Sequence, residues 1–204
     1  MKNINVFMKS VAEVGEDCRK CAEEISESYR PDIIIFIAKS GFLMAKPMAE
    51  YFHCEMADVT VKRPGDEKKD LIRKIFHYVP KFLLFAVLKS KFMYSFNDKH
   101  TERIFIPGMK FQRINLRDYK KILIVDDSAD TGLSLLKAKH EIQKLTPESE
   151  IKIFCYCVIS LSEKRIDVDY FRYRDTIVIT GTSRYSDEHE AFLDELERWK
   201  NENA

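Results

Sequence analysis

The chain has 204 residues, of which 45% are hydrophobic, and its 34 basic and 33 acidic side chains leave a formal net charge of +1. This length suits one α/β domain with a sizeable core. A charge so close to zero excludes the general positive field with which many proteins attract nucleic acid.

The cysteines and the start of the chain indicate the cellular compartment. The five cysteines are an odd number and too sparse for a disulfide scaffold, which favours a reducing compartment. Cys18 and Cys21 form a Cys-x-x-Cys pair, but no second pair stands at metal-ligand spacing, so we predict that both pack on the buried side of a helix. The first residues lack the apolar region of a signal peptide, and we expect a cytoplasmic protein without a transmembrane segment.

The first part of the chain alternates amphipathic helices with buried strands. Residues 8–29 carry apolar side chains at spacings of three and four, which predicts a helix. Residues 33–37 predict a strand that is buried on both faces, and residues 57–63 predict another strand. Between them, residues 42–52 predict a helix that follows a Gly-containing turn at residues 38–41. Such a turn offers backbone N–H groups to an anion, and Lys39 adds positive charge.

Residues 66–100 combine a broad apolar face with many lysines. The apolar run is too short and too charged to span a bilayer. Because an exposed face this apolar needs a partner, we interpret the segment as a helical insertion that covers the ligand site or forms a subunit interface. A basic amphipathic surface that docks on a membrane or a partner protein is the alternative. Residues 104–114 follow it and predict a hairpin with a Pro-Gly turn.

The second half of the chain continues the α/β alternation. A buried strand begins at Lys121 and is predicted to end at Asp126 and Asp127, where a polar loop precedes a helix over residues 135–145. Residues 151–160 predict the next strand and residues 176–180 the last strand of the central sheet. A final helix over 186–199 is expected to pack through Ala191, Leu193, Leu196 and Trp199.

The loop after the strand that begins at Lys121 has two chemical properties. Its aspartates lie at the carboxyl end of a strand, where open α/β sheets bind their ligands. Thr131, Gly132 and Ser134 then place hydroxyls and unshielded N–H groups at a helix N-terminus, which favours a phosphate. The loop therefore predicts a ligand with hydroxyls or a metal at one end and a phosphate at the other.

The full motif reads Val125-Asp126-Asp127-Ser128-Ala129-Asp130-Thr131-Gly132-Leu133-Ser134. It resembles the phosphoribosyl pyrophosphate (PRPP) signature of type I phosphoribosyltransferases, with Ser134 where threonine is commoner. The strand also resembles the first strand of response-regulator receiver domains, but too few residues follow it for such a domain. The spacing from Asp127 to Thr131 does not match the haloacid-dehalogenase phosphatases.

The resemblance implies transfer of ribose 5-phosphate from PRPP to a nucleobase, with a hypoxanthine-, guanine- or xanthine-like base favoured, and release of pyrophosphate. It also implies Mg²⁺ as the cofactor and a homodimer. The implied catalytic residues are Asp126, Asp127 and Asp130, and the metal ligands are Asp126 and Asp127. The implied binding residues are Ser128, Ala129, Asp130, Thr131, Gly132 and Ser134 for the 5-phosphate, and Lys39, Ser40 and Gly41 for pyrophosphate.

The base position follows from weaker matches. The related purine enzymes often have a Pro-Trp after the final strand, where this chain has Tyr185. They also hold the base's exocyclic oxygen with a lysine before that strand, and the nearest candidate here is Lys164, displaced by a few residues. Tyr185 and Lys164 are therefore the candidate base-binding residues.

These observations predict a single domain over residues 1–204 with a Rossmann-like type I phosphoribosyltransferase fold. Its parts are a central parallel sheet of about five strands with helices on both faces, a small hood, and a helical insertion and flexible-loop segment over residues 66–114. Two other function classes remain open. One is a non-catalytic regulator that binds PRPP or a nucleotide, and the other is a membrane- or partner-docking protein that uses the basic apolar insertion.

Overall fold

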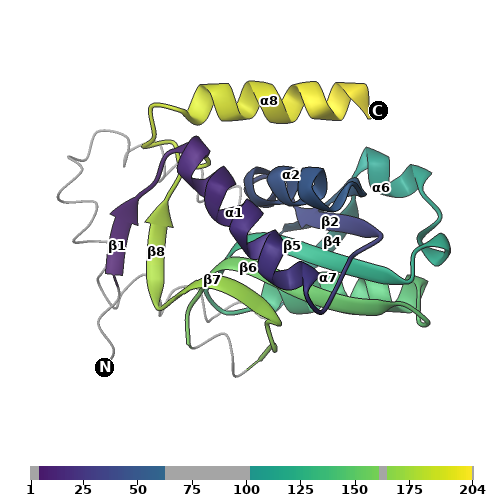
Figure 1. Ribbon diagram of the computed structural model, residues 1–204. Coiled ribbons are helices and arrows are strands. Elements are labelled where there is room, and N and C mark those ends of the chain that lie inside the picture. Colours follow the sequence, from purple (N-terminus) through teal and green to yellow (C-terminus); the bar gives the residue numbers. More distant parts are fainter. Residues whose placement is uncertain (1–4, 63–101, 161–164, 204) are drawn as a thin grey trace.

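The computed structural model describes residues 5–62, 102–160 and 165–203. The predicted insertion over residues 66–100 and the candidate Lys164 lie outside these ranges. A central sheet has helices on both faces, and a small separate sheet lies at one side (Figure 1). The elements are β1 (Asn5–Met8), α1 (Val11–Ser26), β2 (Ile33–Ile37), α2 (Gly41–Phe52), β3 (Glu55–Lys62), β4 (Ile104–Pro107), α6 (Met109–Arg113), the 3₁₀ turn η1 (Leu116–Asp118), β5 (Lys121–Ala129), α7 (Leu133–Leu145), β6 (Glu150–Val158), β7 (Tyr170–Arg174), β8 (Thr176–Ile179) and α8 (His189–Glu202).

The central sheet has the strand order β4-β3-β2-β5-β6-β7. All neighbouring pairs are parallel except β3 with β4, so the predicted α/β fold with about five parallel strands is confirmed. The chain leaves β2 toward β3 on one side and leaves β5 toward β6 on the other. A ligand crevice in such a sheet lies at this reversal of strand order, outside the carboxyl ends of the strands.

The two faces of the sheet form two apolar cores. Successive side chains of a strand point to opposite faces, and all of β2 is buried. Ile34 and Phe36 pack in the core that holds α1, α2 and α8, while Ile33 and Ile35 pack in the core that holds α7. Cys18 and Cys21 are buried on α1, as predicted. Polar and apolar residues do not alternate in β2 because both of its faces are buried.

The predicted hairpin over residues 104–114 is wrong. β4 pairs with β3 instead, and residues 109–113 form the short helix α6. The Gly108 N–H donates to the Asp58 carbonyl at 2.9 Å, and Phe111 packs against Phe105 in the α7 core. A partner strand that is distant in sequence takes the place of the predicted neighbour, which local turn chemistry alone does not indicate.

The assignment of residues 176–180 to the central sheet is also wrong. β8 pairs in parallel with β1 in the separate two-stranded sheet, and the edge of the central sheet is β7. Neither β1 nor β7 was predicted. Their mixed aromatic and charged residues lack the apolar run that marks a central strand, because both lie at an edge and are only partly buried.

The last helix packs through a slightly different set of side chains from the predicted one. Phe192 and Leu196 are its buried residues, and Trp199 packs edge-on against Phe36. Ala191, which was predicted on the packing side, is exposed because the helix is rotated to bury Phe192. Among the described residues, no helix has the length and apolar character needed to cross a membrane.

Candidate active site

Two loops from distant parts of the sequence meet at the reversal of strand order. β2 and β5 are paired neighbours, with Phe36 opposite Val125, so the turn after β2 lies beside the end of β5. A Cβ atom on Gly41 would stand 2.8 Å from the Val125 carbonyl oxygen and 3.5 Å from the Asp126 Cα. A residue without a side chain permits this approach. The Lys39–Gly41 turn therefore lies against the acidic segment, which consists of Asp126 and Asp127.

The acidic segment belongs to the strand rather than ending it. β5 continues through Asp126 and Asp127 to Ala129, which corrects the predicted strand end. Pairing with β6 sets this extension, because Asp126 lies opposite Cys155 and the strands stay in register to Ala129. The polar loop that was predicted to follow Asp127 therefore begins only after Ala129.

The two adjacent carboxylates share a buried position. Asp126 is 6% exposed, Asp127 is half-buried, and the Asp127 N–H donates to Asp126 Oδ1 at 2.9 Å. Burial raises the pKa of Asp126 well above its usual range, and the charge of Asp127 raises it further. Burial also raises the pKa of Asp127, although a hydrogen bond with the Ser40 side chain opposes this. A ligand that brings a cation or hydroxyl donors would relieve this unfavourable burial of charge.

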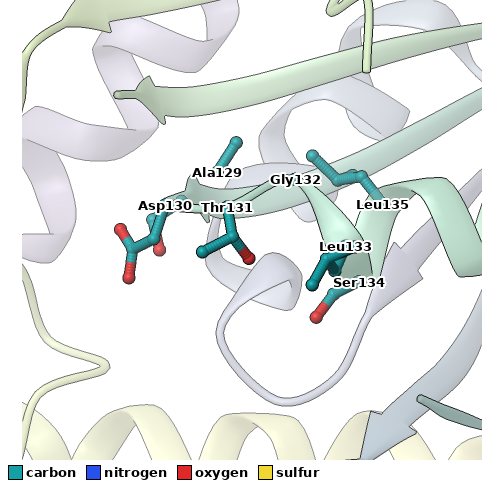
Figure 2. Close-up of a pocket in the computed structure, with 8 residues that line it drawn as sticks. Ala129, Asp130, Thr131, Gly132, Leu133, Ser134 and Leu135 are labelled. Carbon is teal, nitrogen blue, oxygen red and sulfur yellow. The ribbon is translucent and has the colours of Figure 1, made fainter. Parts of the chain in front are cut away.

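The next residues wrap around the N-terminus of α7. A pocket there is lined by Ser128 to Leu135 (Figure 2). Gly132 adopts a left-handed conformation with φ of 71° at the N-cap of the helix, where it makes no side-chain capping hydrogen bond. The first N–H groups of a helix have no partner within the helix and favour an anion. Figure 2 shows the Asp130 carboxylate turned away from the Ser134 hydroxyl, so acid and hydroxyl serve different sides of the loop.

The turn after β2 is held by backbone hydrogen bonds on both sides. The Ala38 N–H donates to the Val59 carbonyl at 2.7 Å, and the Phe42 and Leu43 N–H groups donate to the carbonyls of Lys39 and Ser40, each at 3.2 Å. The Lys39 residue is exposed and Ser40 is half-buried. This fixed turn carries the exposed Lys39 next to Ser40, whose side chain forms a hydrogen bond with Asp127.

Of the two candidate base-binding residues, the structure describes only Tyr185. Tyr185 lies on the loop between β8 and α8, is half-buried, and its N–H donates to the Ser183 hydroxyl at 3.3 Å. It therefore belongs to the side of the small sheet. Sequence reasoning also missed Asp175, which joins that sheet to the central one. The available signal was its residue type, because aspartate is enriched at the positive φ that this residue adopts.

The carboxylates fit Mg²⁺ only together with a ligand. Among the described residues, no group of three or more histidine, cysteine or acidic side chains forms a metal site on its own. Mg²⁺ in phosphate-binding sites commonly uses one or two carboxylates and takes its other ligands from phosphate oxygens and water. Asp126 and Asp127 supply the required oxygen donors, and a bound cation would offset the burial that raises their pKa values.

Comparisons with solved structures agree with this architecture. A purine phosphoribosyltransferase from Pyrococcus horikoshii has a TM-score of 0.61 at 21% identity, covering 89% of this chain and 96% of that one. A hypothetical protein from Neisseria gonorrhoeae with bound ppGpp has a TM-score of 0.62 at 14% identity, covering 100% of both chains. A Helicobacter pylori xanthine-guanine-hypoxanthine phosphoribosyltransferase has a TM-score of 0.59 at 12% identity, covering 96% of this chain and 99% of that one. At these identities the likeness concerns the fold.

Sequence comparison identifies the family. The chain is 26% identical over 154 residues to the hypoxanthine-guanine phosphoribosyltransferase of Schizosaccharomyces pombe, which covers 71% of this chain and 63% of that protein. It thus spans less than two thirds of the length of that relative. The family model described as the phosphoribosyl transferase domain matches residues 9–187, which contain both the turn after β2 and the acidic segment of β5. The chain belongs to the phosphoribosyl transferase domain family.

Proposed function

We propose that this chain transfers ribose 5-phosphate from PRPP to a nitrogen of a purine-like base, with hypoxanthine, guanine or xanthine as acceptor, and releases pyrophosphate. The observation that carries the proposal is a pair of adjacent carboxylates, one buried and one half-buried, beside a helix N-terminus that begins at a glycine, at the reversal of strand order. The choice of base is supported by the relative from S. pombe, whose name specifies hypoxanthine and guanine.

In this proposal, Asp126 and Asp127 hold the 2- and 3-hydroxyls of the ribose, directly or with Mg²⁺. Their pKa values are raised by burial, so a bound cation or hydroxyl donor favours the charged form. The ionised carboxylates then stabilise the positive charge that develops on the sugar as its bond to pyrophosphate breaks. This stabilisation is greater in the transition state than in the ground state and therefore accelerates the reaction.

The phosphate groups of PRPP would bind at two helix starts. The N-terminus of α7 takes the 5-phosphate through the loop of Ser128, Ala129, Asp130, Thr131, Gly132 and Ser134. The turn of Lys39, Ser40 and Gly41 takes the pyrophosphate, where the exposed lysine offers a positive charge. Together the two sites place the sugar above the carboxylates.

The acceptor base would lie on the side of the small sheet. Asp130, whose carboxylate is turned away from Ser134, is the proposed proton acceptor for the base nitrogen. Tyr185 would stack on the ring, and Lys164 would contact its exocyclic oxygen. A cytoplasmic location and a homodimer complete the proposal.

Pyrophosphate release tests the proposed function. The wild-type chain with PRPP and Mg²⁺ is expected to release pyrophosphate with a purine from a panel of hypoxanthine, guanine, xanthine, adenine, uracil and orotate. The double change of Asp126→Asn and Asp127→Asn should reduce the rate by about a hundredfold or more, as loss of preorganised charge does elsewhere. A matched control is Glu23→Gln with Glu24→Gln, an adjacent acidic pair exposed on α1, which should retain the wild-type rate.

Pyrophosphate release, together with PRPP binding and a liposome assay, separates the other function classes. Turnover that survives the double change at Asp126 and Asp127 would rule out the proposed mechanism. PRPP binding without release of pyrophosphate for any base would favour a non-catalytic regulator. Co-sedimentation with anionic liposomes, abolished by charge reversal at Lys68 and Lys69, would favour the docking function.

A further inference from the structure

Asp175 is the junction between the central sheet and the small sheet. It lies between β7, the edge of the central sheet, and β8, which pairs only with β1 among the described residues. Figure 1 shows β1 and β8 side by side and apart from the central strands. The position of the small sheet therefore depends on this junction and on the contacts made around it.

The backbone of Asp175 is bonded to both sheets. Its N–H donates to the Val158 carbonyl at the end of β6 at 2.7 Å, and its carbonyl accepts from the Asn5 N–H of β1 at 3.2 Å. Asp175 has a φ of 49°, in the left-handed region that few residues adopt readily. This conformation turns the chain from one sheet into the other.

The carboxylate of Asp175 accepts two hydrogen bonds from Ser160. Oδ1 accepts from the Ser160 N–H at 2.8 Å, and Oδ2 accepts from the Ser160 hydroxyl at 2.6 Å. Hydrogen bonds to a charged acceptor are stronger than neutral ones. Ser160 is thereby held against the junction by both of its donors.

Ser160 links Asp175 to the loop that carries Asp130. The N–H of the preceding residue, Ile159, donates to the Ala129 carbonyl at 3.1 Å. Ala129 is followed by Asp130, the proposed proton acceptor. Asp175 is therefore linked to the edge of the proposed ribose site by its hydrogen bonds with Ser160, and by the hydrogen bond that the adjacent Ile159 donates to Ala129.

The other side of Asp175 leads to the proposed base side. β8 begins with the next residue, Thr176, and pairs along its length with β1. The Lys9 N–H then donates to the Ile179 carbonyl at 2.9 Å, and the loop that carries Tyr185 follows. The distance between Asp130 and this loop is thus set by the two hydrogen-bonded segments that meet at Asp175.

We propose that Asp175 is a positioning residue for the acceptor base, which fixes the small sheet and its Tyr185 loop relative to Asp130 through its contact with Ser160. This inference rests on the proposed function. The hydrogen bonds of Asp175 described above join it to Val158, Ser160 and Asn5, at the junction of the two sheets. Its loss should therefore weaken use of the base while leaving PRPP binding unchanged.

Variants of Asp175 separate its side chain from its backbone conformation. Asp175→Gly keeps the left-handed conformation available and removes both acceptor oxygens. It is expected to raise the KM for the base about tenfold, because two hydrogen bonds to a charged group are lost, with the KM for PRPP within about twofold. Asp175→Asn also tolerates positive φ and keeps an acceptor for the Ser160 N–H, so it should recover much of the affinity for the base. Ser160→Ala should resemble Asp175→Asn.

Asp169→Gly is the matched control. The Asp169 carboxylate also accepts a backbone hydrogen bond between β6 and β7, from the Ile153 N–H at 2.8 Å, but at the opposite end of these strands. This variant should leave both KM values near those of the wild type. An equal rise of both KM values in Asp175→Gly, no rise in either, or the same rise in Asp169→Gly would overturn the proposal.

Hydrogen exchange tests the positioning role without turnover. In Asp175→Gly, the amides of β1 and β8 should exchange at least about tenfold faster, while those of β2 and β5 stay protected. Unchanged exchange in β1 and β8 would overturn the proposal. If the wild-type chain released no pyrophosphate with any base, the proposed function would fail on its own, and this exchange measurement would still decide whether Asp175 holds the small sheet in place.

Discussion

Gly41 and Val125 are so close that a Cβ atom on residue 41 would stand 2.8 Å from the Val125 carbonyl oxygen. Gly41→Ala must therefore displace either the turn after β2 or the end of β5. We expect the free energy of unfolding to fall by about 1–3 kcal/mol and the dissociation constant for PRPP to rise, because the displaced segments are the proposed pyrophosphate and ribose sites. Urea unfolding and calorimetric titration with PRPP measure the two effects.

Gly15→Ala provides the control for this substitution. A Cβ atom on Gly15 would meet only the Arg19 side chain, at an ordinary distance of 3.7 Å, and the residue lies within α1. Alanine in a helix interior is more favourable than glycine by about 0.5–1 kcal/mol, so this variant should be more stable than the wild type. If both alanine variants changed stability alike, the close contact at Gly41 would not be the cause.

The N-terminus of α7 depends on the conformation of Gly132. Its φ of 71° is left-handed, which costs most residues roughly 1–2 kcal/mol, whereas asparagine adopts it more readily. We expect stability in urea to decrease in the order wild type, Gly132→Asn, Gly132→Ala. An equal loss in the two variants would show that the left-handed backbone does not limit substitution at this position.

The parts of the fold that could be predicted are those in which local pattern and tertiary burial agree. β2 and the first half of β5 read as buried strands because apolar side chains are required on both faces. The motif from Val125 to Ser134 could be assigned because its chemistry is contiguous in sequence. The pairing of Ile104–Pro107 with β3, and of β8 with β1, could not be assigned, because each depends on a partner more than forty residues away.

The same distinction applies to the site. The Gly-containing turn with Lys39 indicated only a general anion site, and the resemblance was needed to assign Lys39 and Ser40 to pyrophosphate. Ser40 lies beside Asp127 because β2 pairs with β5. No sequence pattern indicates the proposed role of Asp175, because its contacts with Ser160 and Asn5 join three separate segments of the chain.

Tyr29 joins the amino ends of two central strands. Its hydroxyl lies 2.9 Å from the carbonyl oxygens of both Ile122 and Glu150, and burial raises the pKa of this phenol, so it stays a donor. Tyr29→Phe removes the hydrogen bonds to both carbonyls and should cost about 1–3 kcal/mol of stability. Tyr51→Phe, at an exposed tyrosine whose hydroxyl lies 3.3 Å from the Ser26 hydroxyl, should cost less than about 0.5 kcal/mol. Equal losses in the two variants would contradict this account.

Asp17 is a buried carboxylate that is surrounded by partners. It accepts hydrogen bonds from the hydroxyls of Tyr156 at 2.8 Å and Tyr173 at 3.0 Å, and it pairs with Arg172 at 3.2 Å and with Lys9. Burial by itself would raise the pKa of Asp17, but the hydrogen bonds from Lys9 and the two tyrosines outweigh burial and lower it. Because the pKa is lower in the folded chain than in the unfolded chain, the stabilisation is present above the unfolded value near 4 and is lost as the pH falls through the folded value.

Asp17→Asn should therefore destabilise the chain at neutral pH by roughly 1.5–3 kcal/mol, the range for hydrogen bonds to a charged group. The difference from the wild type should shrink as the pH falls below about 4, because the wild-type carboxyl then takes up a proton. Urea unfolding at pH values from 7 to about 3 measures this convergence. Glu16→Gln, next to Asp17 but exposed and paired with Lys20 at 3.4 Å, should show a difference of no more than about 1 kcal/mol. A stability difference for Asp17→Asn that stayed constant with pH would mean that the charge of Asp17 does not contribute, and that packing alone explains its burial.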